Sequence, residues 1–82
     1  MPDNRIGVVG ILVQQSQSAQ NINTVLSEYR SIVVGRIGVP YRERGISVIS
    51  LIIDGSTDEV GAMTGKLGRL EGVKVKTALL TK

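Results

Sequence analysis

The sequence predicts an α+β domain in the order β-α-β-β-α-β, in which a four-stranded antiparallel sheet carries two helices on one face. Three observations support this fold class. Residues 5–13 and 46–53 are apolar at nearly every position, as is typical of strands buried on both faces. An amphipathic helical segment follows each of these runs. A second, more polar strand-like run then completes each half of the chain.

The first half of the chain predicts a strand, a helix and a strand. Residues 5–13, RIGVVGILV, form the first strand, and Ser16 or Ser18 in the polar loop after it can cap the free N–H groups of the helix. The apolar residues of that helix fall on one stripe, Ala19, Ile22, Val25, Leu26 and Tyr29. Residues 31–39 form the second strand, and we expect Pro40 to end it because proline cannot donate to a strand ladder.

The second half repeats this order. A charged turn at residues 41–45 leads into the third strand, 46–53, which Asp54 and Gly55 are expected to end. The S-x-x-E pattern of residues 56–59 is a capping box and predicts the start of the second helix. The apolar stripe of this helix consists of Val60, Met63, Leu67 and Leu70. Gly72 is expected to end the helix.

This is the ferredoxin-like order, in which the first and third strands are central and the second and fourth are edges. The distribution of charge agrees with that assignment. The final run, residues 73–79, alternates between apolar and polar side chains and carries Lys74 and Lys76, and the second strand carries Arg36. Charged side chains on edge strands discourage pairing with other sheets.

The face of the sheet opposite the helices is predicted to be apolar and uncovered. We expect it to carry one alternate set from each central strand, namely Val9, Ile11 and Val13 with the matching residues of 46–53. An exposed apolar patch of this size indicates a partner. We infer that the chain associates with itself as a homodimer or homotetramer, through packing of sheet faces or pairing of sheet edges.

The length and the absence of an apolar span limit the class of protein. The 82 residues predict a single domain, 1–82, whose own core is small, so association would add burial. No run reaches the roughly 18 apolar residues that a membrane span requires. The polar start of the chain does not resemble a signal peptide, so we expect a cytoplasmic protein with no membrane partner.

The composition also excludes several kinds of catalytic or metal site. The chain has no cysteine and no histidine. Disulfides, thiolate metal sites and histidine general bases are therefore excluded, and we expect no metal, no cofactor and no catalytic centre. Asp58 and Glu59 are interpreted as first-turn residues of a helix, favoured by the helix dipole.

The positive charge is concentrated in one segment. Ten basic and seven acidic residues give a net charge of +3, and Arg36, Arg42, Arg44 and Glu43 lie within nine residues of one another. Such a local surplus is not typical of a broad nucleic-acid-binding face. The only aromatic residues, two tyrosines, also lie outside the predicted central strands, so direct binding of nucleic acid is not expected.

The loop between the first strand and the first helix is a candidate ligand-binding site. A helix N-terminus offers free N–H groups suited to a carboxylate or phosphate, and Gln14, Gln15, Ser16 and Asn21 can add side-chain hydrogen bonds to a small polar ligand. Such a site would lie where this region meets a neighbouring subunit. The alternative is a polar loop with an ordinary helix cap.

The segment GRIGVPYRERG, residues 35–45, is the most unusual part of the chain. Its polar and aromatic residues can contact another subunit or bind an anion, since guanidinium groups bind carboxylates in a bidentate manner. These candidates are Arg36, Tyr41, Arg42, Glu43 and Arg44. The alternative is a solvated turn in which Glu43 pairs with a neighbouring arginine.

Three glycines, Gly61, Gly65 and Gly68, lie within the second predicted helix. Each costs roughly 1 kcal/mol relative to alanine in a helix interior. We expect close packing of this helix against a neighbour to offset that cost.

Three long segments of the chain resemble a known family. They are RIGVVGIL at residues 5–12, VVGRIGVPYRERGISVISLIID at 33–54 and GKLGRLEGVKVKTA at 65–78. Together they resemble the small regulators assigned provisionally to the iron-only hydrogenase system. The resemblance implies an ACT-like domain, similar to the C-terminal domain of nickel-responsive repressors. It also implies a regulatory oligomer with a role in hydrogenase expression or maturation.

Two departures from these relatives limit the mechanism. Nickel-responsive domains bind metal through histidine and cysteine, which this chain lacks. Amino-acid-binding ACT domains usually have a glycine between the first strand and the first helix, whereas this chain has only glutamines and serines at 14–18. Two hypotheses therefore stay open: a module that senses a small polar or acidic metabolite, and a module that binds another regulatory protein without a small ligand. Transcriptional regulation would require a partner that binds DNA or an unusual DNA-binding surface.

Overall fold

The computed structural model describes residues 4–81. Four strands form one antiparallel sheet in the order β2-β3-β1-β4. The strands are β1 (Asn4–Val13), β2 (Val33–Tyr41), β3 (Ile46–Ser56) and β4 (Val73–Leu79). The helices are α1 (Ala19–Glu28) and α2 (Thr57–Gly68), with short 3₁₀ helices η1 (Ser16–Ser18), η2 (Arg30–Ile32) and η3 (Arg42–Arg44).

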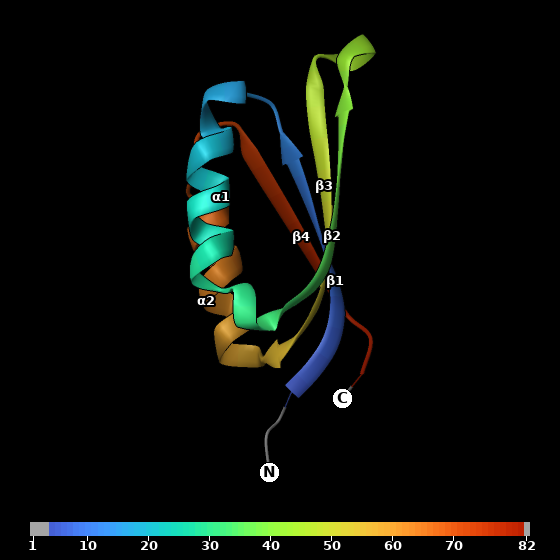
Figure 1. The fold of residues 1–82 in the computed structure, drawn as a ribbon, viewed down its shortest axis with the longest axis vertical. Helices are drawn as coiled ribbons and strands as arrows, with labels where there is room; N and C mark the ends of the chain where they lie inside the picture. Colours follow the sequence, from blue (N-terminus) through green and yellow to red (C-terminus); the bar gives the residue numbers. More distant parts are fainter. Residues whose placement is uncertain (1–3, 82) are drawn as a thin grey trace.

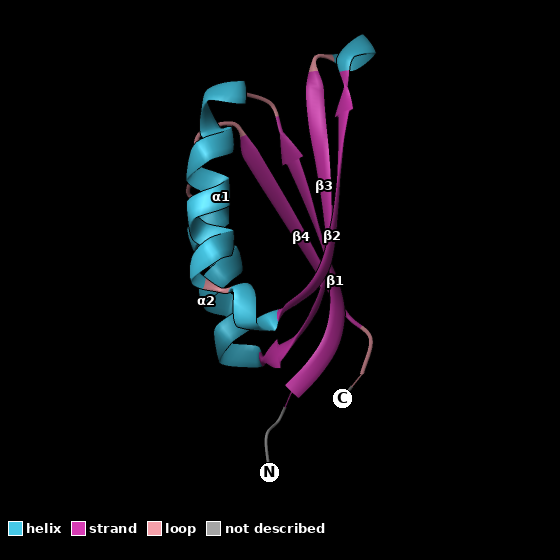
Figure 2. Ribbon diagram, viewed as in Figure 1, coloured by secondary structure: helices cyan, strands magenta, loops and turns pink. Residues whose placement is uncertain are grey.

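The molecule has two layers, with both helices on one face of the sheet (Figure 1). The sheet lies beside the helices in this view, and the β2–β3 hairpin extends past the ends of β1 and β4 (Figure 2). The predicted β-α-β-β-α-β order is confirmed, and so is the assignment of the first and third strands to the centre of the sheet.

One hydrophobic core fills the space between the helices and the sheet. It consists almost entirely of aliphatic side chains, because the chain has no Phe or Trp. The most deeply buried side chains are Val9, Ile11, Ile22, Leu51, Ile53, Met63 and Leu67. The stripes predicted for both helices supply their share of this core, and Val73 and Val75 of β4 pack against it.

Two strands are longer than the sequence predicted. β2 continues through Pro40, which pairs with Ser47. A proline is tolerated there because β2 is an edge strand, and on its free side a residue without an N–H removes no ladder hydrogen bond. β3 continues through Asp54 and Gly55, which pair with the start of β1. Because β3 is a central strand, these two residues pair with β1, and the local sequence gives no sign of that pairing.

The two helices begin differently. Ser56 accepts from the Glu59 N–H at 3.1 Å and donates its own N–H to the Glu59 carboxylate at 3.0 Å, which confirms the predicted capping box. Ser18 precedes α1 but its side chain does not cap it. Its buried hydroxyl instead donates to the Glu71 carbonyl oxygen at 2.6 Å. Ser18, which was expected to cap the helix, therefore makes a tertiary contact.

The second helix also ends earlier than expected. α2 stops at Gly68, and Gly72 lies in the following turn with a φ of 70°. Gly45 takes a positive φ of 66° after η3, as the predicted charged turn requires. In both turns a glycine permits the left-handed backbone.

The three helix glycines are not closely packed within this chain. A Cβ atom added at Gly61, Gly65 or Gly68 would meet nothing within 4 Å, and these residues line a shallow hollow between α2 and β4. The expectation of a close approach is therefore wrong for contacts inside the chain. The spacing of small residues alone could not distinguish packing from open space.

The uncovered face of the sheet is apolar, but the prediction chose the wrong alternate set. Val9, Ile11 and Val13 point toward the helices and are buried. The opposite set faces away from the helices, and its members pair across the strands: Ile6, Val8 and Leu12 of β1, Ile37, Val39 and Tyr41 of β2, Ile46, Val48 and Ile52 of β3. We call these nine residues the open sheet face. Because both central strands are apolar on both sides, their own period could not decide which set is buried.

One polar contact joins the ends of the helices. The Lys66 ammonium lies 3.5 Å from the Glu28 carboxylate and 5.2 Å from the centre of the Tyr29 ring. The Tyr29 side chain first, and the Glu28 carboxylate second, raise the pKa of Lys66 above its ordinary value. The pair is exposed to solvent, so its contribution to stability is small.

Within residues 4–81, no helix is long and apolar enough to cross a membrane. In the same range, no cluster of three or more acidic side chains could hold a metal ion.

Candidate ligand-binding site

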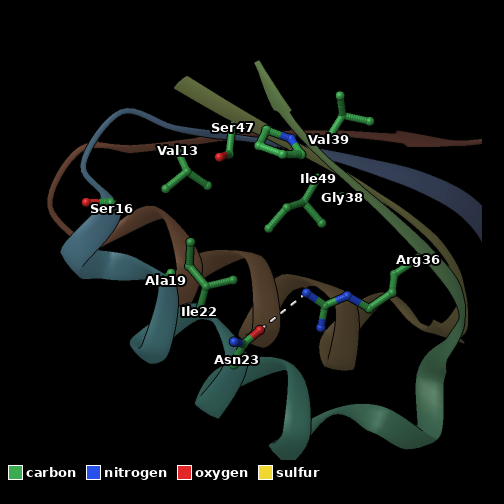
Figure 3. A pocket seen from close by; sticks show the side chains of 11 residues that line it. Val13, Ser16, Ala19, Ile22, Asn23, Arg36, Gly38, Val39, Ser47 and Ile49 are labelled. Atoms are coloured by element: carbon green, nitrogen blue, oxygen red, sulfur yellow. Dashed lines mark hydrogen bonds between the residues drawn. The ribbon is translucent and has the colours of Figure 1, made fainter. Parts of the chain in front are cut away.

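A cleft opens between α1 and the β2–β3 hairpin, on the side of the sheet that the helices cover (Figure 3). Its volume is about 260 Å³. We call it the α1–β2 cleft and define it by the residues that line it. These are Val13, Ser16, Ala19, Ile22, Asn23, Arg36, Gly38, Val39, Pro40, Ser47 and Ile49.

The helical periodicity of the 3₁₀ turn and α1 supplies one wall. Ser16, Ala19, Ile22 and Asn23 are spaced by three, three and one, which places them on one side of the helical segment. Ile22 forms part of the core beneath the cleft, while Ser16 and Asn23 stay exposed along its rim. The wall that this helical segment contributes is therefore apolar at its base and partly polar at its rim.

The alternation of the hairpin strands supplies the other wall. Arg36, Gly38 and Pro40 occupy every second position of β2 and point to the helix side. The register pairs Gly38 with Ile49 and Pro40 with Ser47, so β3 adds these two residues to the wall. The Val39 side chain points away from the cleft, and only its backbone borders it (Figure 3).

Gly38 leaves space inside the cleft. A Cβ added there would meet only the Ile49 Cγ1 atom, at 3.9 Å, which is ordinary van der Waals contact. Any larger side chain at this position would project into the cleft. The cleft therefore depends on a residue without a side chain in the middle of β2.

The polar groups lie at the two ends of the cleft. At one end the Arg36 Nη2 donates to the Asn23 Oδ1 at 3.3 Å, bridging β2 and α1 (Figure 3). At the other end lie the hydroxyls of Ser16 and Ser47. The Arg36–Asn23 bond is long for an N–H···O bond and joins exposed groups, so it is weak.

A shallower hollow adjoins the cleft at each end and shares lining residues with it. Toward the hairpin tip, a hollow of about 290 Å³ shares Val13, Ser16, Pro40 and Ser47 with the cleft and adds Gln14, Arg42, Gly45 and Ile46. Toward η2, a hollow of about 360 Å³ shares Asn23 and Arg36 and adds Leu26, Ser27, Arg30 and Val33. Among residues 4–81, three arginines and no acidic residue line the cleft and these two hollows, which together we call the groove.

The structure brings together half of the loop residues that the sequence singled out as ligand contacts. Ser16 lines the cleft and Gln14 lines its extension. Gln15 turns away: its side chain lies against Gly72 and accepts from Gln17 at 2.9 Å. Asn21 is exposed on α1 and lines none of the hollows described above.

The hairpin residues separate in the same way. Arg36 and Arg42 line the groove, whereas Tyr41 lies on the open sheet face. Glu43 and Arg44 lie in η3 at the hairpin tip and are exposed. In the described part of the chain the one ion pair is Lys66–Glu28, so Glu43 is not paired with a neighbouring arginine.

Of the residues that line the cleft, only Ser16 and Arg36 were among the predicted contacts, and the others include Asn23, Gly38, Ser47 and Ile49. Asn23 could have been found from the helical spacing, because it follows Ser16 by seven residues and so shares its face. The strand residues required the register of the hairpin. That register depends on the length of β2, which continues past Pro40.

Comparison with protein families identifies the chain. Residues 5–77 match the TM1266-like family, which is described as an iron-only hydrogenase system regulator. The chain belongs to this family. The predicted resemblance is thereby confirmed over most of the sequence, and with it the assignment to a group of regulators whose role is given provisionally. A comparison with curated proteins gave no match.

Solved structures agree with this assignment. The uncharacterized protein TM1266 from Thermotoga maritima is 31% identical, with a TM-score of 0.91 over 96% of this chain and 100% of that one. The ACT domain of GTP pyrophosphokinase from Chlorobium tepidum is 18% identical, with a TM-score of 0.70 over 96% of this chain and 89% of that domain. A nitrogen regulatory PII-like protein from Thiomonas intermedia, bound to ADP, AMP and bicarbonate, is 14% identical with a TM-score of 0.53 over 92% and 93%. The last two show the fold alone, which is ACT-like.

Proposed function

We propose that this protein is an oligomeric regulatory module that senses a small polar or acidic metabolite in the α1–β2 cleft. The family description supports a regulatory role in the iron-only hydrogenase system. The cleft supplies a place for a ligand, and the open sheet face supplies a place for a second copy of the chain. The module acts by binding, not by catalysis.

The alternation of side chains along the β2–β3 hairpin is the observation that best supports this function. Arg36, Gly38 and Pro40 line the cleft, while Ile37 and Val39 between them lie on the open sheet face. One strand therefore borders the ligand on one side and a partner on the other. A ligand that shifts this strand changes the surface that the partner contacts.

Thermodynamic linkage makes this arrangement measurable. If a ligand changes the affinity of the chains for one another, association changes the affinity for the ligand by the same factor. Light scattering on the purified protein, alone and with a panel of amino acids and small acids, gives the mass of the assembly. Thermal unfolding with the same panel reports binding directly.

The expected results are a stable oligomer and a response to part of the panel. A ligand at 100 times its Kd stabilises the folded state by about 2.7 kcal/mol. For a domain of this size that corresponds to a rise in Tm of roughly 10–20 °C. A protein that shows no thermal response to any compound would contradict the sensing role.

The open sheet face also favours a second candidate, an assembly module that binds another regulatory protein without a small ligand. Nine apolar or aromatic side chains on one face exceed what isolated surface residues explain. A monomer in light scattering that recovers a specific partner from its own cell extract would favour this candidate. Recovery of the chain alone would count against it.

A further inference from the structure

The charge of the groove limits the chemical class of the ligand more narrowly than the position of the groove does. Arg30, Arg36 and Arg42 line the cleft and its two extensions, and no Asp or Glu in the part of the chain that the structure describes lines any of the three. Two acidic residues are adjacent in sequence to residues of the groove. Glu43, which follows Arg42, belongs to the exposed η3 turn, and Glu28, which follows Ser27, lies 3.5 Å from the Lys66 ammonium. A group that enters this groove therefore meets positive charge, hydroxyls and amides.

The central cleft is otherwise apolar. Val13, Ala19, Ile22, Pro40 and Ile49 form its floor and sides. A volume of 260 Å³ corresponds to about nine water molecules at ~30 Å³ each. The cleft thus suits an aliphatic or aromatic body of several carbon atoms, with a polar group only at an end.

Arg36 is placed to receive that polar group. Its guanidinium reaches across the mouth of the cleft to the Asn23 Oδ1, and the contact of 3.3 Å is weak. A carboxylate can replace the amide oxygen and accept two parallel N–H bonds, which are roughly twice as strong as neutral ones. The structure therefore holds a cation at the cleft mouth with an easily displaced partner.

We propose that the ligand of the α1–β2 cleft is a compact monocarboxylate with a branched or aromatic apolar body and no ammonium group. This inference rests on the proposed sensing function and narrows its ligand. The carboxylate pairs with Arg36, and the body lies over Ile22 and Ile49 beside Gly38. An amino acid of the same skeleton is disfavoured, because its ammonium group would lie beside the Arg36 guanidinium, and no Asp or Glu of the described chain lines the cleft to pair with it.

The central cleft offers one guanidinium group to an acid, because Arg36 is the one arginine of the described chain that lines it. Arg42 lines only the hollow toward the hairpin tip and follows Arg36 by six residues, so at ~3.3 Å per residue their backbones are about 20 Å apart. Arg30 lines only the hollow toward η2. One carboxylate at Arg36 therefore satisfies the charge of the central cleft.

Two sets of matched probes test this inference by calorimetry on the intact protein. The first set is 4-methylpentanoate, leucine and 4-methylpentanamide, and the second is 3-phenylpropanoate, phenylalanine and 3-phenylpropanamide. Within each set the body is constant, while the ammonium is added or the negative charge is removed. We expect an acid to bind at least about tenfold more tightly than its amino acid and its amide.

The outcomes separate this inference from the proposed function. Tighter binding of leucine or phenylalanine than of the matching acid overturns the inference and leaves the sensing function standing. Binding by neither acid also overturns it, and a thermal response to other compounds of the wider panel would still support sensing. No response to any compound overturns both.

Variants identify the site of binding. Arg36→Gln is expected to weaken binding of the acid about tenfold while leaving the amide unchanged. Arg44→Gln is the matched control, since Arg44 carries the same charge on the same hairpin but lines none of the three hollows. Equal losses in the two variants would indicate a general effect of charge and would overturn the pairing with Arg36.

Gly38→Leu provides a second, independent test. The new side chain would fill the cleft, so binding of the acid should be lost, whereas the strand gains an apolar residue in place of a glycine. The variant should therefore be at least as thermally stable as the wild-type protein. A stable Gly38→Leu protein that still binds the acid with wild-type affinity would place the ligand elsewhere.

Discussion

Val48→Lys tests whether the open sheet face is buried between copies of the chain. Val48 lies near the middle of this face, between Leu12 of β1 and Val39 of β2, and its exposed fraction is 40% in the single chain. A lysine there can lay its stem along these neighbours and keep its ammonium in water. The free energy of unfolding of one chain should therefore change by no more than about 0.5 kcal/mol.

Association should respond much more strongly. Full burial of a valine side chain is worth about 1.5–3 kcal/mol. The 40% that remains exposed accordingly represents ~0.6–1.2 kcal/mol of burial available to an interface. A twofold axis uses the same residue on both copies, so the loss is about 1.2–2.4 kcal/mol per dimer. The dissociation constant should rise about tenfold to fiftyfold, and desolvating the two lysines adds to this.

Light scattering after size-exclusion chromatography, over a hundredfold range of protein concentration, measures this change. Gln20→Lys is the matched control, because it adds the same charge on the exposed surface of α1. The wild-type and control proteins should keep the same mass, and Val48→Lys should dissociate at a higher concentration than either. Circular dichroism at a concentration where all three proteins are monomeric should give similar melting curves. An unchanged mass for Val48→Lys would refute burial of this face.

Three further predictions concern the fold. Ser56→Ala removes one half of the capping box and should lower the free energy of unfolding by about 1 kcal/mol, or Tm by about 4–8 °C, in thermal denaturation. Gly55→Ala should destabilise the protein by about 1–3 kcal/mol, because the new Cβ atom would lie 2.8 Å from the Ile32 Cγ2 atom. Gly61→Ala has open space around the new Cβ atom and should stabilise the protein by up to about 1 kcal/mol. Equal effects of the two substitutions in urea denaturation would contradict this reasoning. The pKa of Lys66 is raised above 10.5, so its contribution is fully present below that pH and is lost as the pH rises through the raised pKa. Wild type should therefore exceed Lys66→Met slightly in Tm at pH 8, and the difference should vanish in strongly alkaline solution.

The order of elements could be predicted from the sequence because each local signal agreed with the final fold. The runs at 5–13 and 46–53 lack a polar face, which only central strands of this fold can accept. The S-x-x-E pattern marked the start of α2 at the correct residue. Boundaries were less predictable where a neighbour decided them, as at Pro40, which an edge strand tolerates.

The identity of the buried sheet face could not be read from the central strands, yet the fourth strand held the missing information. β4 alternates between Val73 and Val75 on one side and Lys74 and Lys76 on the other. Its register pairs Val73 with Val13 and Val75 with Ile11, so the lysines share the opposite face. A strict alternation on an edge strand therefore orients the whole sheet, provided that the register is known.

Some residues of the candidate site could be predicted from the local sequence, and others required the strand register. Ser16 and Arg36 carry their polar character in the sequence, and both border the cleft. Gly38 and Ser47 acquire their role only through the pairing of two strands, which places them opposite α1. Gln15 is polar and was predicted to contact a ligand, but its side chain lies against Gly72, which has a positive φ, and not in the cleft.

The proposed coupling between the cleft and the open sheet face rests on the geometry of a pleated strand. Side chains of β2 alternate, so Arg36 and Gly38 cannot move relative to α1 without moving Ile37 and Val39 relative to any partner. β2 has hydrogen-bonded neighbours on only one side, so it is freer to shift than β1 or β3. A coupling free energy of about 1–3 kcal/mol is typical of regulatory proteins, and it would change the dissociation constant of an assembly by about 5-fold to 150-fold. A ligand with equal affinity for both arrangements of the hairpin would not shift the equilibrium between them. A compound that binds but leaves the mass of the assembly unchanged would therefore show that binding in the cleft does not regulate association through the sheet.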